Sequence, residues 1–188
     1  MGAPTVVLMT IRRWSNNKTV LATGINCLSR LFRYSSDCPW TFLHQMNAAL
    51  EALFDLQAVE TIVAAMKSFP NSGRLQMEAI TALDCLLGCD RMDFDKKKLH
   101  TATVKFASDE KDGPLAVLKA MREFPDGVML QVFGCRFLCK LCEEEHVRVS
   151  MRKAGLGSTV AASLEKNPEA KDLQEWGGKI LPLLFPGR

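Results

Sequence analysis

Apolar residues recur along this chain at the three- and four-residue spacing of a helix. Between residues 75 and 87, the apolar positions Leu75, Ala79, Leu83 and Leu86 fall on one helical face. The segments 130–142 and 173–185 repeat this spacing, with a glycine in place of Ala79. A small residue at this position lets another helix approach closely. The pattern predicts an all-α chain of packed helices.

The helical segments belong to an internal repeat. Stretches that begin at Ile62, Val117 and Val160 align without a gap, and a fainter fourth copy runs from Leu8 to Leu31. Successive copies are offset by 55, 55 and 43 residues. The three clear copies share a proline, a Leu-Gln pair and two later leucines: Pro70, Leu75, Gln76, Leu83 and Leu86; Pro125, Leu130, Gln131, Leu138 and Leu141; Pro168, Leu173, Gln174, Leu181 and Leu184.

Each repeat is predicted to contain three helices. Proline disfavours helical geometry in the residue before it, so the repeated proline separates one helix from the next. Upstream of each aligned stretch, helix formers and apolar residues at roughly helical spacing predict a further helix, in 47–59, 96–108 and 143–155. Gly155 is expected to end the last of these. The longer offsets imply insertions at about 34–45 and 88–96.

Three helices in about 43 residues is the size of an armadillo or HEAT unit. The stretch from Ala120 to Leu141, with its Ala-Met, Pro turn, Leu-Gln, Gly-Cys and two leucines, resembles the armadillo repeat family. It looks in particular like the armadillo subtype found beside leucine-rich-repeat kinases and in related protist proteins. The resemblance implies a right-handed α-solenoid of about four repeats that forms a single domain over residues 1–188, with repeats at about 5–33, 46–88, 96–142 and 143–186.

The resemblance also implies a concave groove, lined by the third helix of each repeat, that binds extended segments of other proteins without catalysis. Relatives that bind nuclear-import signals carry a Trp and, four residues later, an Asn at the groove positions. Here these positions hold Asn26 and Arg30, Thr81 and Cys85, Arg136 and Lys140, and Lys179 and Leu183.

Four of these eight groove residues are basic and none is acidic. We therefore expect the groove to bind an extended acidic or phosphorylated segment of a partner protein, whose anions pair with the basic residues. Ordinary solvated side chains, which form weak surface ion pairs, are the alternative interpretation.

Cys135, Cys139, Cys142 and His146 have the spacing of one helical face, which raises the question of a metal or redox site. A tetrahedral zinc ion needs four ligand atoms within about 2.3 Å. Cys135 and His146 would lie about 16 Å apart along a helix axis, so one helix cannot supply all four ligands. In the repeat alignment Cys135 and Cys142 replace apolar residues, which predicts core packing. A metal- or redox-responsive protein using the three cysteines is the third alternative.

Composition and charge argue against several other classes of protein. The net charge of +3, from 24 basic and 21 acidic residues, is too small to indicate nucleic-acid binding. The apolar stretch near the N-terminus is too short for a signal peptide or a membrane span. Neither a glycine-rich phosphate loop nor a nucleophile motif is present. We expect a cytoplasmic protein, with the nucleus as the alternative compartment, that is not an enzyme, holds no cofactor or metal, and binds neither nucleic acid nor membranes.

The runner-up function is structural. Apolar residues at the end of the last repeat, Ile180, Leu183, Leu184 and Phe185, would leave surface that a solenoid has to cover. A partner, a second copy of the chain or further repeats of a longer array would cover it. In this interpretation the chain is an assembly or dimerising subunit without a separate groove ligand.

Overall fold

The structure, a computed structural model, describes residues 3–33, 57–87 and 113–185. Within these ranges the chain forms helices and no strand, which confirms the all-α prediction. The helices divide between two compact units, Met1–Ala102 (unit 1) and Thr103–Arg188 (unit 2). None of the helices in the described ranges combines the length and the apolar composition that crossing a membrane requires.

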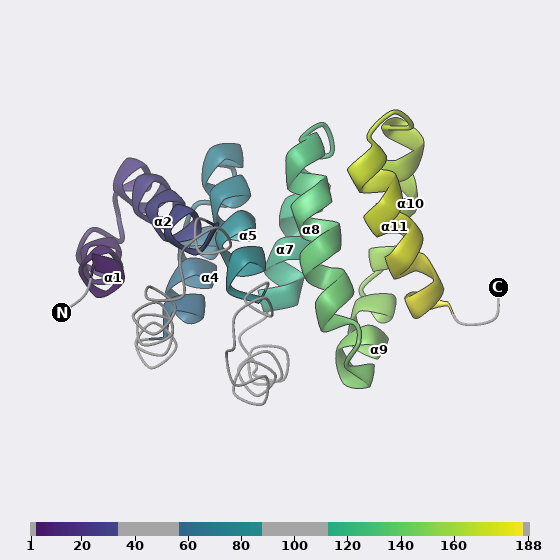
Figure 1. Cartoon of the computed structure of the whole chain (residues 1–188), viewed down its shortest axis with the longest axis horizontal. Coiled ribbons are helices and arrows are strands. Elements are labelled where there is room, and N and C mark those ends of the chain that lie inside the picture. The colour runs from purple at the N-terminus through teal and green to yellow at the C-terminus, as the bar shows by residue number, and fades with distance from the viewer. Residues whose placement is uncertain (1–2, 34–56, 88–112, 186–188) are drawn as a thin grey trace, which may run out of the picture. The chain divides into compact units, whose positions relative to one another are not determined.

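The described part of unit 1 consists of two helical hairpins. The first pairs α1 (Ala3–Arg13) with α2 (Lys18–Arg33), and the second pairs α4 (Ala58–Ser68) with α5 (Gly73–Leu87). Helix α1 contacts α4 and α2 contacts α5, so that corresponding helices of the two hairpins stack on each other (Figure 1). Nearest-neighbour stacking of this kind is how consecutive repeats bury a shared core.

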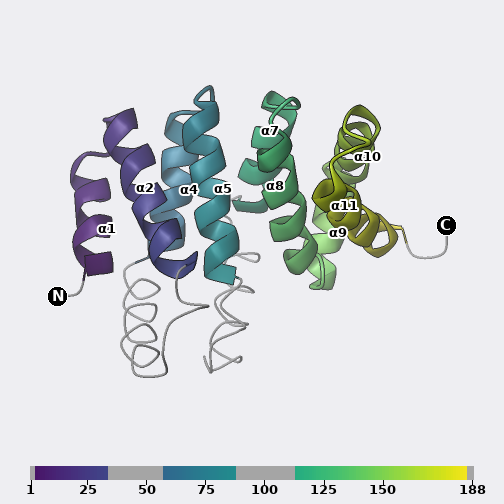
Figure 2. The same ribbon diagram turned by 45° about the horizontal axis from the view of Figure 1, so that its top comes forward.

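The described part of unit 2 has the same plan with one helix more. One hairpin pairs α7 (Gly113–Glu123) with α8 (Val128–Leu141), and the other pairs α10 (Leu156–Lys166) with α11 (Lys171–Leu184). Helix α7 contacts α10 and α8 contacts α11. Helix α9 (Glu145–Lys153) connects the hairpins and packs against α10 and α11 (Figure 2).

Several local predictions are confirmed. Pro70, Pro125 and Pro168 lie in the turns of the hairpins, and the predicted helix in 143–155 is present as α9. Gly155 follows the last turn of α9 with a left-handed φ of 82°, as expected of a glycine that ends a helix. The insertions at 34–45 and 88–96 and the helices predicted in 47–59 and 96–108 lie outside the described residues, except for 57–59, where α4 begins.

The repeated small residue lies where two helices of a hairpin approach most closely. A methyl group added to Gly134 would lie 2.7 Å from the sulfur of Met121, closer than side chains normally come. The equivalent contacts join Gly24 with Ile11 and Gly177 with Leu164, where the added methyl would lie 2.6 Å from the nearest atom in each case. The alignment of the repeats therefore corresponds to a repeated packing contact.

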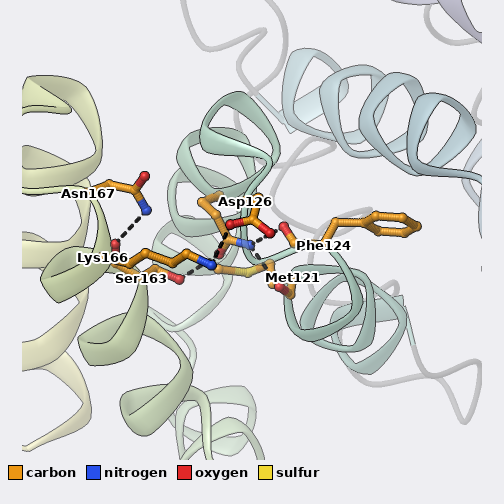
Figure 3. A network of polar contacts seen from close by, with 7 residues as sticks. Met121, Phe124, Asp126, Ser163, Lys166 and Asn167 are labelled. Atoms are coloured by element: carbon orange, nitrogen blue, oxygen red, sulfur yellow. Dashed lines mark hydrogen bonds and ion pairs between the residues drawn. The ribbon is translucent and has the colours of Figure 1, made fainter.

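The repeated glutamine bonds the end of the preceding helix. Gln131 is fully buried, and its Nε2 donates to the carbonyl oxygens of Met121 at 2.7 Å and Phe124 at 3.0 Å (Figure 3). Carbonyls at a helix C-terminus lack a partner within the helix, and the amide supplies one to Met121. The Phe124 carbonyl also accepts from the backbone N–H of Gly127 at 3.1 Å. Equivalent pairs of bonds join Gln76 to Met66 and Phe69, and Gln174 to Leu164 and Asn167.

The same glutamine also links the two hairpins of unit 2. Ser163 on α10 donates from its Oγ to Oε1 of Gln131 at 2.8 Å. The corresponding positions of unit 1 hold Leu21 and Ala65, which are both buried and apolar. A Lys166–Asp126 ion pair closes the outer edge of this contact in unit 2 (Figure 3). Because both of its side chains are exposed, we assign that pair little weight in stability.

An arginine bridge joins consecutive hairpins in both units. Arg12 Nε donates to Thr61 Oγ1 at 3.0 Å, and Arg122 Nε donates to Thr159 Oγ1 at 3.0 Å. Each arginine also reaches the backbone just before the next helix, at the carbonyl of Gln57 or of Ala154. Gln57, like its counterpart Gly155, has a left-handed φ, here 55°. The two units are thus held together internally by equivalent bonds.

Replacing Gln131 tests whether these amide bonds stabilise the fold. Gln131→Ala removes the buried donor to the Met121 carbonyl and one of the two donors to the Phe124 carbonyl, and we expect the free energy of unfolding to fall by about 2 kcal/mol. Gln174→Ala removes the same two bonds at a partly exposed site, where water can replace the amide, so its loss should be about 1 kcal/mol. Urea unfolding of both variants measures the difference. Equal losses would show that burial of the amide is not what matters.

Candidate partner-binding surface

The predicted groove residues all lie on the second helix of a hairpin. Unit 1 holds Asn26 and Arg30 on α2 and Thr81 and Cys85 on α5. Unit 2 holds Arg136 and Lys140 on α8 and Lys179 on α11. Since α2 packs on α5 and α8 on α11, each unit brings its own residues onto adjacent helices.

In unit 1 the predicted residues are used largely within the unit. Asn26 Nδ2 donates to Oε2 of Glu78 at 2.5 Å, which joins α2 to α5. Thr81 is 4% exposed, so it offers almost no surface to a partner, whereas Arg30 is exposed and Cys85 is partly buried. Glu78 was not among the predicted residues, and its carboxylate works against binding of an acidic segment at this place.

In unit 2 two of the three predicted cations are held over aromatic rings. The guanidinium carbon of Arg136 lies 5.0 Å from the centre of the Phe133 ring, and Nζ of Lys179 lies 4.3 Å from the centre of the Trp176 ring. These pairs occupy equivalent positions, since both members are offset by 43 residues between the repeats. Contacts of this geometry are typical cation–π interactions. We call Phe133, Arg136, Lys140, Trp176 and Lys179 the cation–aromatic surface.

The sequence analysis missed the two aromatic residues of this surface. Phe133 and Trp176 each lie three residues before a predicted cation, which is the same face of the same helix. Both are partly buried, so the rings contact the core and still reach the surface. The three-residue spacing in two consecutive repeats was the available signal.

The lysines of α8 and α11 both influence the thiol of Cys139. Burial and the charge of Glu143 raise the pKa of the Cys139 thiol, while Lys179 and Lys140 lower it. Lys179 also bonds Glu175 at 2.6 Å, with half or more of each side chain exposed. An exposed pair four residues apart on a helix contributes only about 0.3–0.5 kcal/mol, so an incoming carboxylate can replace Glu175.

The other two cysteines, Cys135 on α8 and Cys142 directly after its last residue, are core residues. Cys135 and Cys142 have no exposed surface, and burial, followed by a smaller effect of Cys139, raises the pKa of each thiol to about 12. The thiolate is the form that attacks electrophiles and binds metals, and at neutral pH these groups keep their protons. In the described ranges no three His, Cys, Asp or Glu residues are placed to share a metal ion. The burial and the raised pKa values favour the packing interpretation over redox chemistry.

No protein-family model matches the chain, and neither a curated protein nor a solved structure does so. The resemblance to armadillo repeats therefore stays a prediction that rests on the aligned residues of this chain.

The raised thiol pKa values predict a loss of stability in alkali. The unfolded chain releases these protons near pH 9.0, while the folded chain holds them to about pH 12. Stability from burying the neutral thiols is complete below pH 9 and is lost as the pH rises towards 12. We expect about 1 kcal/mol per thiol to be lost between pH 9 and 10, over and above other groups.

Urea unfolding at both pH values, in the natural chain and in the double variant Cys135→Ala/Cys142→Ala, isolates this contribution. The variant should lose less stability between the two pH values than the natural chain. An identical loss would mean that the folded thiols titrate normally.

Proposed function

We propose that this protein is a non-catalytic binding module, an armadillo-like right-handed solenoid of about four repeats, whose cation–aromatic surface binds an acidic segment of another protein. Repeated helical hairpins with equivalent small-residue, glutamine and arginine contacts support the solenoid. The single observation that carries the binding role is the pair of cations held over aromatic rings at equivalent positions of α8 and α11.

Cations held in this way suit a binding surface. A long basic side chain loses rotamer freedom when it pairs with an anion, and contact with a ring removes part of that freedom beforehand. Arg136 can offer two parallel N–H donors to one carboxylate or phosphate. Lys140 and Lys179 add positive charge beside it, and opposite charge on a partner accelerates association.

Charge reversal tests this proposal. Arg136→Glu/Lys140→Glu should weaken binding to partners captured from native lysate, and to acidic test peptides, by at least about tenfold, because two attractions become repulsions. The matched control is Lys119→Glu/Lys153→Glu, which makes the same change in net charge at exposed positions of α7 and α9.

Capture on immobilised protein and fluorescence anisotropy give the two readouts, with circular dichroism to verify that each variant is folded. Binding that is equally weakened by both double variants would reflect net charge alone. Binding that neither double variant changes would contradict the proposed function.

Ile180 and Leu184, which the sequence predicted to leave apolar surface at the end of the last repeat, are fully buried. The assembly function stays a second candidate because α1 exposes apolar side chains. Val6 and Met9, on one face of α1, and Trp14 just beyond its end are 52%, 49% and 53% exposed. Self-association through this face would bury them in a second copy of the chain.

Met9→Glu tests self-association at α1. If copies associate through this face, light scattering over a dilution series should give a dimer for the natural chain and a monomer for the variant, because a charge would be buried in the contact. A monomer for both chains at micromolar concentration would contradict the assembly function.

A further inference from the structure

Resting on the proposed function, we infer that the occupant of the cation–aromatic surface is a polyproline II segment with two acidic residues three positions apart, which lies across α8 and α11. The backbone conformation of the partner segment and the spacing of its acidic residues are what this adds to the proposed function. It follows from the repetition of the surface from one helix to the next.

The surface consists of two equivalent platforms. Each is built from an aromatic ring and the cation above it, Phe133 with Arg136 on α8 and Trp176 with Lys179 on α11. Helices α8 and α11 pack directly on each other, and packed helices lie about 8–10 Å apart. Equivalent side chains on the two helices are therefore separated by about one interhelical distance.

The spacing of the platforms matches one conformation of an extended segment. Polyproline II has three residues per turn and rises about 3.1 Å per residue, so every third side chain projects from the same side after about 9.3 Å. In a β-strand, side chains on one side are about 6.8 Å or 13.6 Å apart, since the rise is about 3.4 Å and alternate residues point away. A polyproline II segment presents one acidic residue to each cation, and a strand does not.

The aromatic rings point to the same conformation independently. Proline-rich segments bind grooves lined by aromatic side chains, and they lose little conformational freedom on binding because the helix is already formed. Phe133 and Trp176 repeat at the same interval as the cations, so residues between the acidic positions can pack on the rings. The exposed side chain of Met129, one turn before Phe133, extends the apolar part of the surface.

The equivalent positions of unit 1 lack both elements of a platform. Thr23 and Glu78 stand where unit 2 has aromatic rings, and Asn26 and Thr81 stand where it has cations. Asn26 and Glu78 bond each other. The inference therefore applies to unit 2 alone.

Spacing is tested with proline-rich, fluorescein-labelled peptides of equal length and charge that carry two glutamates two, three, four or seven positions apart. Anisotropy titrations with the full chain should show the three-position peptide binding about tenfold more tightly than the others, because it alone engages both cations. The Lys179→Glu variant should show no preference for the three-position peptide. It should bind a peptide whose second glutamate is replaced by lysine more tightly than the peptide with both glutamates. Lys153→Glu, at an exposed site on α9, is the matched control.

Each outcome has a separate meaning. Tightest binding of the peptide with glutamates two positions apart would indicate a strand, and tightest binding of the seven-position peptide would indicate a helix. Either result would overturn this inference and leave the proposed function standing. Equal binding at all spacings would likewise overturn it. If no acidic peptide binds at any spacing, the proposed function itself fails.

Discussion

In three of the four described hairpins, the side-chain amide of one glutamine bonds two carbonyls at the end of the preceding helix. This occurs at Gln76, Gln131 and Gln174, each ten residues after one acceptor and seven after the other. The two bonds tie the end of the first helix of a hairpin to the second helix, and a different crossing at Gln131 would remove a buried donor from the Met121 carbonyl. In these hairpins the turn also determines which face of the second helix points away from the first helix.

Stacking of hairpins within a unit relies on side chains that bridge repeats. In unit 2 the Gln131 amide accepts from Ser163 while Arg122 reaches Thr159, so the middle and the edge of the contact are both hydrogen-bonded. Unit 1 keeps the arginine bridge, from Arg12 to Thr61, and has apolar residues in the middle. Replacing both members of a buried polar pair by apolar groups costs little, whereas replacing one leaves an unpaired group. The two units are alternative solutions to the same packing problem.

Sequence periodicity was sufficient to predict the helices of the described ranges, the proline turns and the burial of Cys135 and Cys142, because each follows from spacing along one helix or from local geometry. It could not reveal the bonds of Gln131 or Arg12, since the partners are backbone carbonyls or a residue 49 positions away. It also treated Thr81 as a groove residue, although the structure buries it. Whether a polar residue on a helix faces a partner or a neighbouring helix depends on crossing angles, which spacing does not determine.

The same scaffold carries two different surfaces. The contacts that build the hairpins recur in both units. The positions that would meet a ligand differ, since α8 carries an aromatic residue and a cation where α5 carries Glu78 and Thr81. Fold contacts constrain the chain wherever the repeat is used, but exposed positions on the second helices are free to change without cost to stability. The combination of cation and ring appears in both repeats of unit 2 and in neither described repeat of unit 1. The proposal of a ligand that spans both helices rests on this repetition on α8 and α11.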